Sequence, residues 1–182
     1  MAACVFQSGE FRTYIVIIKF KDLSSLREEH KDKKIVFCSG TFDLTHAGHV
    51  LFLEDCKKYG DLLVVAVGSD FNQRVHAKGK GRPVQNEHLR LKMVSSLKPV
   101  DYALLDINAK DGDILALLPD FLDALKPDVY VVNQDAFDIP RRRELIEKFS
   151  TEMIVLERVC PPEFESISTS NMIKKIKTDV EK

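Results

Sequence analysis

The sequence predicts an α/β fold, a single doubly wound domain organised around a five-stranded parallel sheet. Short apolar runs alternate along the chain with segments of helical periodicity. Each run is apolar throughout rather than at every second residue, which is typical of strands that helices cover on both faces. At 182 residues the chain has room for one domain with a substantial core. We place this domain at residues 34–182 and treat residues 1–33 as an N-terminal extension.

The predicted strands are apolar runs bounded by charged or turn-forming residues. The five runs are Ile35–Cys38, Leu62–Val67, Tyr102–Leu105, Val129–Val132 and Met153–Leu156. The extension contains the β-branched segment Tyr14–Ile18, which is compatible with one further strand.

The predicted helices fill the segments between these strands. They are Asp22–His30, a helix that begins near Ala47, His88–Leu97, Asp113–Leu125, Pro140–Phe149 and Thr169–Lys177. We expect residues 71–86, which are rich in lysine and glycine, to form a long polar connection. The helix at 88–97 is expected to bury an apolar stripe. The stripe consists of Leu89, Met93, Val94 and Leu97.

Composition excludes several classes of protein. The net charge of −1 at pH 7 argues against a general binder of nucleic acid or membrane surfaces. The four cysteines form no C-x-x-C pair, and Cys38 and Cys56 lie within apolar patterns. We therefore expect buried thiols in a reducing cytoplasm rather than disulfides or a zinc site. We see no signal peptide, and the run at 14–18 is too short to span a membrane.

The segment from Ser39 to His49 is the strongest candidate for a functional site. A strand ends there in a tight turn, and a helix begins near Ala47. His46 and His49 are three residues apart, so their side chains leave neighbouring positions on the first helical turn. Free N–H groups at a helix N-terminus favour an anion, and the imidazoles add hydrogen-bond donors. The pattern predicts a phosphate site, with a pair of core or metal-binding histidines as the plainer alternative.

The same segment resembles the signature of a known superfamily. Gly40-Thr41-Phe42-Asp43 with His46-Ala47-Gly48-His49 is similar to the G-x-F-D-x-x-H-x-G-H motif of the nucleotidylyltransferase superfamily. The resemblance extends over residues 20–177 and is greatest to heptose-phosphate adenylyltransferases and glycerol-phosphate cytidylyltransferases. It implies a Rossmann-like domain in which the two histidines are catalytic. It also implies a nucleotide-binding role for the remaining motif residues, which are Gly40, Thr41, Phe42, Asp43 and Gly48.

Cations between the second and third predicted strands are further candidates. Lys78 and Lys80 lie in a glycine-containing loop that can fold over a triphosphate, although the same composition also suits a solvated loop. The resemblance implies that Arg90 contacts the NTP phosphates. It also places Asp135, after the fourth strand, beside the pocket for the base and the acceptor.

The start of the last predicted helix carries three hydroxyl side chains, Ser168, Thr169 and Ser170. They can cap free N–H groups or bind phosphate oxygens with them. The stretch resembles the superfamily's second signature, R-T-E-G-I-S-T-T, but Glu163 stands in place of the arginine and Ser166 in place of the glycine. One phosphate-binding cation is therefore missing or supplied from elsewhere.

Three consecutive arginines, Arg141, Arg142 and Arg143, follow the fourth strand. The plain interpretation is a solvated helix face. The alternative is that one of them holds the phosphate of the acceptor, because a guanidinium binds phosphate through two hydrogen bonds.

These residues together predict an enzyme that transfers a nucleoside monophosphate from ATP or CTP to a sugar or polyol phosphate and releases pyrophosphate. The resemblance implies Mg²⁺ that accompanies the NTP, no dedicated protein metal site, and a cytoplasmic homodimer. The alternative is a catalytically impaired nucleotide sensor of the same fold. A tRNA synthetase fragment shares the histidine motif but needs a K-M-S-K-S-like loop, which we do not find.

Overall fold

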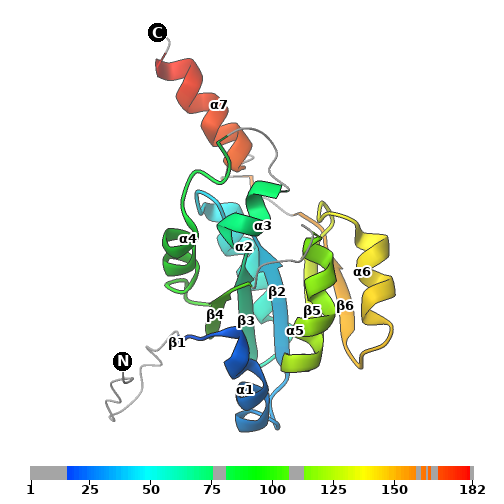
Figure 1. The fold of residues 1–182 in the computed structure, drawn as a ribbon. Helices are drawn as coiled ribbons and strands as arrows, with labels where there is room; N and C mark the ends of the chain where they lie inside the picture. The colour runs from blue at the N-terminus through cyan, green and yellow to red at the C-terminus, as the bar shows by residue number, and fades with distance from the viewer. Residues whose placement is uncertain are drawn as a thin grey trace, which may run out of the picture.

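A parallel sheet with helices on both faces forms the centre of the molecule (Figure 1). The structure is a computed structural model, and it describes residues 16–75, 81–106, 113–158, 161–162, 164 and 168–180. The strands lie side by side in the order β1-β4-β3-β2-β5-β6, and all five neighbouring pairs are parallel. Their bounds are Val16–Ile17 (β1), Ile35–Gly40 (β2), Leu62–Val67 (β3), Tyr102–Leu105 (β4), Val129–Asn133 (β5) and Glu152–Leu156 (β6).

The five predicted strands are confirmed, each to within two residues at either end. A sixth strand, β1, has only two residues and extends the sheet by pairing with β4. The segment that we assigned to an N-terminal extension therefore contributes to the same sheet. Its helix α1 also contributes Leu23 and Leu26 to the core on one face of that sheet.

The helices occupy the connections between the strands. Their bounds are Phe20–Asp22 (η1, a 3₁₀ helix), Leu23–Glu29 (α1), Ala47–Lys57 (α2), Asp70–Val75 (α3), Glu87–Val94 (α4), Ile114–Leu117 (η3, a 3₁₀ helix), Leu118–Leu125 (α5), Ile139–Ile146 (α6) and Thr169–Val180 (α7). None of the described helices is long and apolar enough to cross a membrane.

One predicted connection was wrong, because residues 70–75 form helix α3 at the start of what we expected to be a polar loop. The side chain of Ser69 accepts a hydrogen bond from the backbone N–H of Asn72 at 3.2 Å, which is how a serine caps a helix start. Six residues are too few for a recognisable helical period, so the sequence pattern gave no indication of this helix.

The apolar stripe predicted for the helix at 88–97 was wrong at two of its four positions, whereas Val94 and Leu97 pack in the core as expected. Leu89 and Met93 are 53% and 45% exposed, whereas Arg90, Leu91 and Val94 are buried. The helix is rotated so that an arginine, counted as polar in any hydrophobic pattern, faces the interior. Only Val94 of the expected stripe is fully buried.

Two hydrophobic cores lie on opposite faces of the sheet. Strand β2 supplies Phe37 to the core beneath α1, α5 and α6, and Cys38 to the core beneath α2 and α4. This alternation follows from the two-residue period of a strand. Cys38 and Cys56 are buried free thiols, as expected, and burial raises the pKa of Cys56 far above its usual range. The other two cysteines lie outside the described residues.

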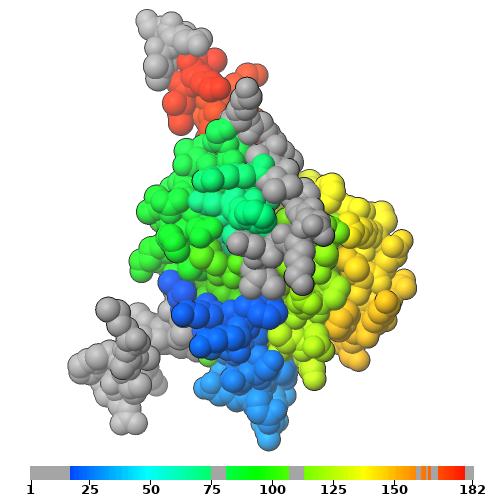
Figure 2. Space-filling model, viewed as in Figure 1, coloured from blue at the N-terminus to red at the C-terminus, as the bar shows by residue number. Residues whose placement is uncertain are grey.

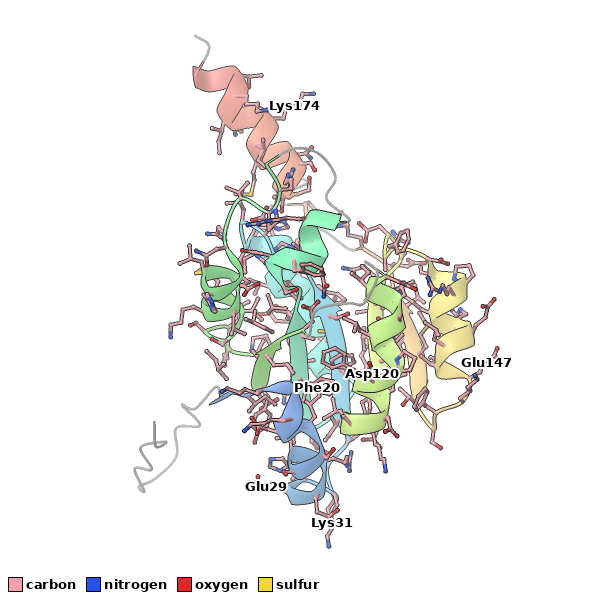
Figure 3. All side chains as sticks on the ribbon, in the orientation of Figure 1. Phe20, Glu29, Lys31, Asp120, Glu147 and Lys174 are labelled. Atoms are coloured by element: carbon pink, nitrogen blue, oxygen red, sulfur yellow. The ribbon has the colours of Figure 1, made fainter. Side chains whose placement is uncertain are left out.

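The reversal of strand order fixes where a ligand can bind. The chain runs from β2 through β3 to β4 on one side, then crosses back over the sheet to β5 and β6 on the other. In open parallel sheets the crevice for a ligand opens at such a reversal, outside the carboxyl ends of the strands. Helix α7 stands away from the rest of the molecule beyond this edge (Figures 1 and 2). In Figure 3, Lys174 marks this projecting helix and Phe20 marks η1, where the Phe20 ring meets Phe121 edge to face.

Candidate functional site

A cavity of about 670 Å³ opens at the carboxyl ends of the strands. The N-terminus of α2 borders it on one side, and η3, α5 and α6 border it on the other. Most predicted site residues line this cavity. They are Gly40, Thr41, Phe42, Asp43, His46, Gly48, His49, Asp135, Arg142, Ser168, Thr169 and Ser170.

The two histidines form a stacked pair at the start of α2. Their ring centroids are 3.9 Å apart, and the ring planes differ by 23°. The backbone N–H of His46 donates to Nδ1 of His49 at 3.4 Å, so the neutral His49 ring carries its proton on Nε2. Nδ1 of His46 is buried and has no hydrogen-bond partner among the described residues. Both residues line the cavity, and the pair has one buried ring nitrogen without a partner, on His46, and one ring N–H group, on His49.

Burial keeps both imidazoles neutral. It lowers the pKa of His46 below its usual value, and the charge of Arg158 lowers it further. The pKa of His49 is lowered to about 3, first by burial, then by His46 and Arg158, against a smaller opposing effect of Asp43. Near pH 7 these side chains are thus neutral hydrogen-bonding groups, and a bound anion would raise the pKa of both.

Asp43 holds together the segments that surround the histidines. Its carboxylate accepts the backbone N–H groups of Val84 and Gln85 at 2.9 and 3.0 Å, which fixes the segment after residue 80. Its backbone carbonyl accepts the hydroxyl of Thr169 at 2.7 Å, which fixes the start of α7. The preceding residue, Phe42, has a left-handed backbone conformation with a φ of 52°, and its ring packs edge to face against His49. Asp43 therefore connects the motif loop, the segment at 84–85 and the start of α7 through hydrogen bonds.

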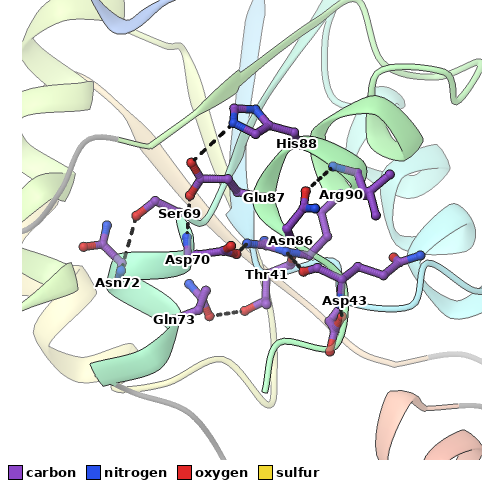
Figure 4. Close-up of polar contacts among 12 residues, drawn as sticks. Thr41, Asp43, Ser69, Asp70, Asn72, Gln73, Asn86, Glu87, His88 and Arg90 are labelled. Atoms are coloured by element: carbon purple, nitrogen blue, oxygen red, sulfur yellow. Dashed lines mark hydrogen bonds and ion pairs between the residues drawn. The ribbon is translucent and has the colours of Figure 1, made fainter. Parts of the chain in front are cut away.

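Arg90 is fully buried behind this loop and does not line the cavity (Figure 4). Its guanidinium donates to the backbone carbonyls of Thr41 and Gln85 at 2.7 and 3.0 Å and to the carboxylate of Asp70 at 2.7 Å. The structure therefore does not bring Arg90 together with the histidines, although we had expected it to contact the NTP phosphates. It instead connects the motif loop to α3 and to the segment before α4.

The start of α7 meets the loop that follows α3. Arg82 lines the cavity and donates to the hydroxyl of Ser170 at 3.2 Å, while the hydroxyl of Ser168 accepts the backbone N–H of Asn171 at 3.2 Å. Lys78 and Lys80, predicted to fold over a triphosphate, lie outside the described residues.

Two further cations line the cavity: Arg82, which lies in the predicted triphosphate loop but was not singled out, and Arg158, which sequence reasoning missed. Arg158 lies two residues beyond the end of β6 and pairs with Asp135 at 3.2 Å, with both side chains about half exposed. The sequence feature that could have identified Arg158 is its position just after a predicted strand, at the edge of the sheet where ligands bind. We had looked for a cation at position 163, which lies outside the described residues.

The three arginines of α6 have different surroundings. Arg142 lines the cavity, where it donates to the backbone carbonyl of Phe137 at 2.8 Å and to the hydroxyl of Tyr130. Arg141 pairs with Asp113, and Arg143 is exposed. One arginine of the three therefore reaches the cavity.

Comparisons with known proteins agree with this arrangement. A model of the family described as Cytidylyltransferase-like matches residues 37–175. The FAD synthase of Ferroglobus placidus is 37% identical over 147 residues, which cover 80% of this chain and 89% of that protein. The Bifunctional protein HldE of Campylobacter jejuni subsp. doylei is 37% identical over 161 residues, which cover 88% of this chain. The match covers only 31% of that protein, so the chain spans about a third of its length.

Solved structures show the same fold. The lipopolysaccharide core biosynthesis protein of Thermoplasma volcanium is 30% identical with a TM-score of 0.59, over 70% of this chain and 99% of that one. The pantoate-beta-alanine ligase of Francisella tularensis, at 17% identity and a TM-score of 0.60 over 88% of this chain and 73% of that one, shares the fold alone. With the histidine motif at the carboxyl edge of the sheet and these matches, the chain belongs to the cytidylyltransferase-like family of nucleotidyltransferases.

Proposed function

We propose that this protein transfers a nucleoside monophosphate from ATP or CTP to a small phosphorylated acceptor and releases pyrophosphate. The observation that carries this proposal is the stacked pair His46 and His49, which lies at a helix N-terminus and opens into a cavity lined by Arg82 and Arg158. A second helix N-terminus, that of α7, borders the same cavity with its hydroxyl side chains. Such an arrangement suits a polyphosphate.

The proposed reaction needs positioning rather than a general base. The acceptor phosphate is already largely ionised near pH 7, because its second pKa is about 6. One of its oxygens attacks the α-phosphorus in line, a P–O bond forms, and the bond to the pyrophosphate oxygen breaks as pyrophosphate leaves with the electron pair. The neutral imidazoles of His46 and His49 would donate hydrogen bonds to phosphate oxygens as charge moves onto the leaving group.

Mg²⁺ is proposed to enter with the NTP. Such an ion keeps most of its waters and binds mainly through substrate phosphates. Asp135 is the exposed carboxylate at the cavity that could hold such an ion, because the carboxylate of Asp43 already accepts two backbone N–H groups. When bound, the ion would neutralise part of the charge of the triphosphate.

The acceptor is the least constrained part of the proposal. The resemblance of the sequence to heptose-phosphate and glycerol-phosphate enzymes favours a sugar or polyol phosphate. The relatives named FAD synthase extend the range, because FAD contains a flavin phosphate linked to adenosine monophosphate. All of these acceptors are phosphomonoesters, and the proposed chemistry is the same for each.

The test is pyrophosphate release from ATP, CTP, GTP and UTP, each with a panel of sugar, polyol and flavin phosphates. We expect turnover with ATP or CTP, and a loss of about 10²-fold or more in the His49→Ala variant, the effect of removing one donor to the transition state. His88→Ala, at an exposed histidine outside the cavity, is the matched control and should keep full activity. NTP binding without turnover on any acceptor would instead identify the alternative, a nucleotide sensor.

The expected homodimer and cytoplasmic location remain proposals. Helix α7 stands away from the body of the molecule (Figure 2). Ile176 on this helix is 57% exposed, which suits a helix that packs against a second copy. Light scattering should then give twice the 20.7 kDa mass of the chain.

A further inference from the structure

The two sides of the cavity differ in chemistry. The α2 side carries the histidines, and the edge between β5 and β6 carries Asp135 and Arg158. The opposite side, between η3, α5 and the turn before α6, is formed by apolar side chains, which we call the apolar lobe. The apolar lobe consists of Ile114, Leu115, Leu118, Phe121, Ala136 and Phe137.

The apolar lobe belongs to the other face of the sheet from the histidines. Leu118 and Phe121 belong to the core beneath α1, α5 and α6, and Ile114 and Ala136 pack against it, whereas α2 packs on the core of the opposite face. A ligand that fills the cavity therefore passes over the end of β2, from the histidines to the apolar lobe. Ser39, the exposed side chain at that end of β2, lies on the path.

Arg142 supplies the charge at the apolar lobe. The carbonyl of Phe137 and the hydroxyl of Tyr130 hold its Nε and Nη1 groups, and its guanidinium carbon lies 6.0 Å from the centre of the Tyr130 ring. Within the described residues, no protein group accepts a hydrogen bond from its Nη2 group. The side chain is thus fixed in place and still has N–H groups for an anion.

Few uncharged polar side chains of the described residues reach this side of the cavity. They are Ser39, Asn133 and the hydroxyl of Tyr130, which interacts with Arg142 and Ser39. Gln73 and Asp106 also line the cavity, but Gln73 already accepts the hydroxyl of Thr41, and Asp106 accepts the backbone N–H of Ser69. A sugar or polyol placed here would lose water from several hydroxyl groups with few partners in exchange, which disfavours binding. An apolar or aromatic group would lose few hydrogen bonds to water, and it would remove from water its own apolar surface and that of Phe137, the most exposed side chain of the lobe.

We propose that the acceptor is a phosphomonoester whose organic part is apolar or aromatic, with that part in the apolar lobe and its phosphate beside Arg142 and the histidines. This inference rests on the proposed nucleotidyl transfer and narrows its acceptor. It departs from the sugar or polyol phosphate that the sequence resemblance implies. Phe137, 59% exposed at the rim of the lobe, provides an aromatic surface against which a planar group can stack.

The first test compares phosphomonoesters of similar charge in two assays. Phenyl phosphate and FMN represent the apolar class, and glycerol 3-phosphate and ribose 5-phosphate the polyol class. Calorimetry measures binding to the protein alone, and pyrophosphate release with ATP or CTP measures transfer. We expect the apolar class to bind at least tenfold more tightly and to have at least a tenfold higher kcat/KM. Equal or weaker binding of both apolar compounds overturns the inference, whatever the turnover.

Two matched variants test whether the apolar compounds bind in the apolar lobe. Phe137→Ser should weaken binding of phenyl phosphate and FMN about fivefold or more and leave glycerol 3-phosphate unchanged. Phe71→Ser, at an aromatic side chain of similar exposure outside the cavity, is the control and should change neither. A Phe137→Ser variant that binds the apolar compounds as well as the original protein contradicts the placement. Tight binding of these compounds without pyrophosphate release would instead contradict the proposed function and leave the binding lobe in place.

Discussion

Arg158 illustrates what a single residue contributes to this site. Its positive charge lowers the pKa of both histidines, and its ion pair with Asp135 is largely exposed. Exposed ion pairs contribute little to stability, so the guanidinium can exchange its carboxylate for a phosphate at small cost. Arg158 is therefore suited to replace the cation that the sequence lacks at position 163.

We predict that Arg158→Gln raises the KM for the NTP at least tenfold while the acceptor KM changes little. Arg158→Lys should restore part of the affinity, since it keeps the charge but loses the paired hydrogen bonds. Arg143→Gln, at an exposed arginine that does not line the cavity, is the control. Steady-state kinetics with each substrate varied in turn measures both constants. An unchanged NTP KM would exclude Arg158 from the triphosphate site.

Arg90 has a different role, because all its described contacts are internal. Replacing it with methionine, which has a similar shape, leaves the Asp70 carboxylate and the carbonyls of Thr41 and Gln85 without their partner. The Arg90 side chain is fully buried, whereas that of Asp70 is 21% exposed and can regain water, so we expect a cost of about 3 kcal/mol, the lower end for breaking a buried pair. For a chain of this size we expect the Tm of Arg90→Met to fall by roughly 10 °C. Arg74→Met, at an exposed arginine of α3, should melt with the original protein.

An Arg90→Met variant with an unchanged Tm and a raised NTP KM would reverse this assignment. The sequence could not show whether Arg90 stabilises the fold or binds the NTP phosphates. The position of Arg90 fits the superfamily pattern, but its direction depends on groups 20 and 49 residues away in the chain. The same holds for Asp43, whose partners lie 41 and 42 residues further along the chain.

At the scale of elements, the strands were predictable and the orientations of some helices were not. Strands β2, β3 and β5 are buried over most of their length and β4 at its two central residues, so each sequence is a largely continuous apolar run. Helix α4 instead buries Arg90 through hydrogen bonds, and periodicity cannot recognise a face that is buried for that reason. Helix α3 was missed because its six residues are too few for a helical period to be recognised, and a single serine cap before it is a weak indication of a helix.

The arginines of α6 offer a test of orientation within one helix. Successive residues on a helix point about 100° apart, so the three side chains cannot all face the cavity. We predict that Arg142→Gln raises the acceptor KM strongly with little change in the NTP KM, that Arg143→Gln is silent, and that Arg141→Gln loses only its exposed pair with Asp113. Acceptor kinetics of the three variants, measured side by side, gives the answer. If Arg142→Gln is silent with an accepted substrate, the acceptor phosphate is held elsewhere.

At the scale of the whole molecule, the location of the site followed from topology. Segments after β2, β3, β4, β5 and β6 all reach one cavity, because parallel strands bring their carboxyl ends to one edge. Sequence reasoning therefore identified the edge and most residues of the motif loop. It did not identify the apolar lobe, because apolar residues of η3 and α5 look the same whether they face the core or a cavity.

The buried histidines should make the stability of the whole protein depend on pH. The pKa of His49 is lowered to about 3 in the folded protein, whereas an exposed histidine in the unfolded chain has a pKa of about 6.5. Between these values the unfolded state binds more protons, so the free energy of unfolding decreases as the pH falls below about 6.5. Asp106 acts in the opposite direction, because burial raises its pKa and the folded protein then holds the proton more tightly.

A comparison of variants separates the effect of His49 on the pH dependence of stability from that of Asp106. We predict that the drop in Tm from pH 7 to pH 5 is smaller in His49→Gln than in the original protein, because glutamine does not titrate. His88→Gln removes an exposed histidine and should retain the full drop. Differential scanning calorimetry at pH 7, 6 and 5 measures each slope, and Asp106 contributes equally to all three proteins. If the Tm of His49→Gln falls with pH as steeply as that of the original protein, the prediction is wrong. His49 would then gain its proton in the folded protein as readily as in the unfolded chain, contrary to its burial beside the cavity.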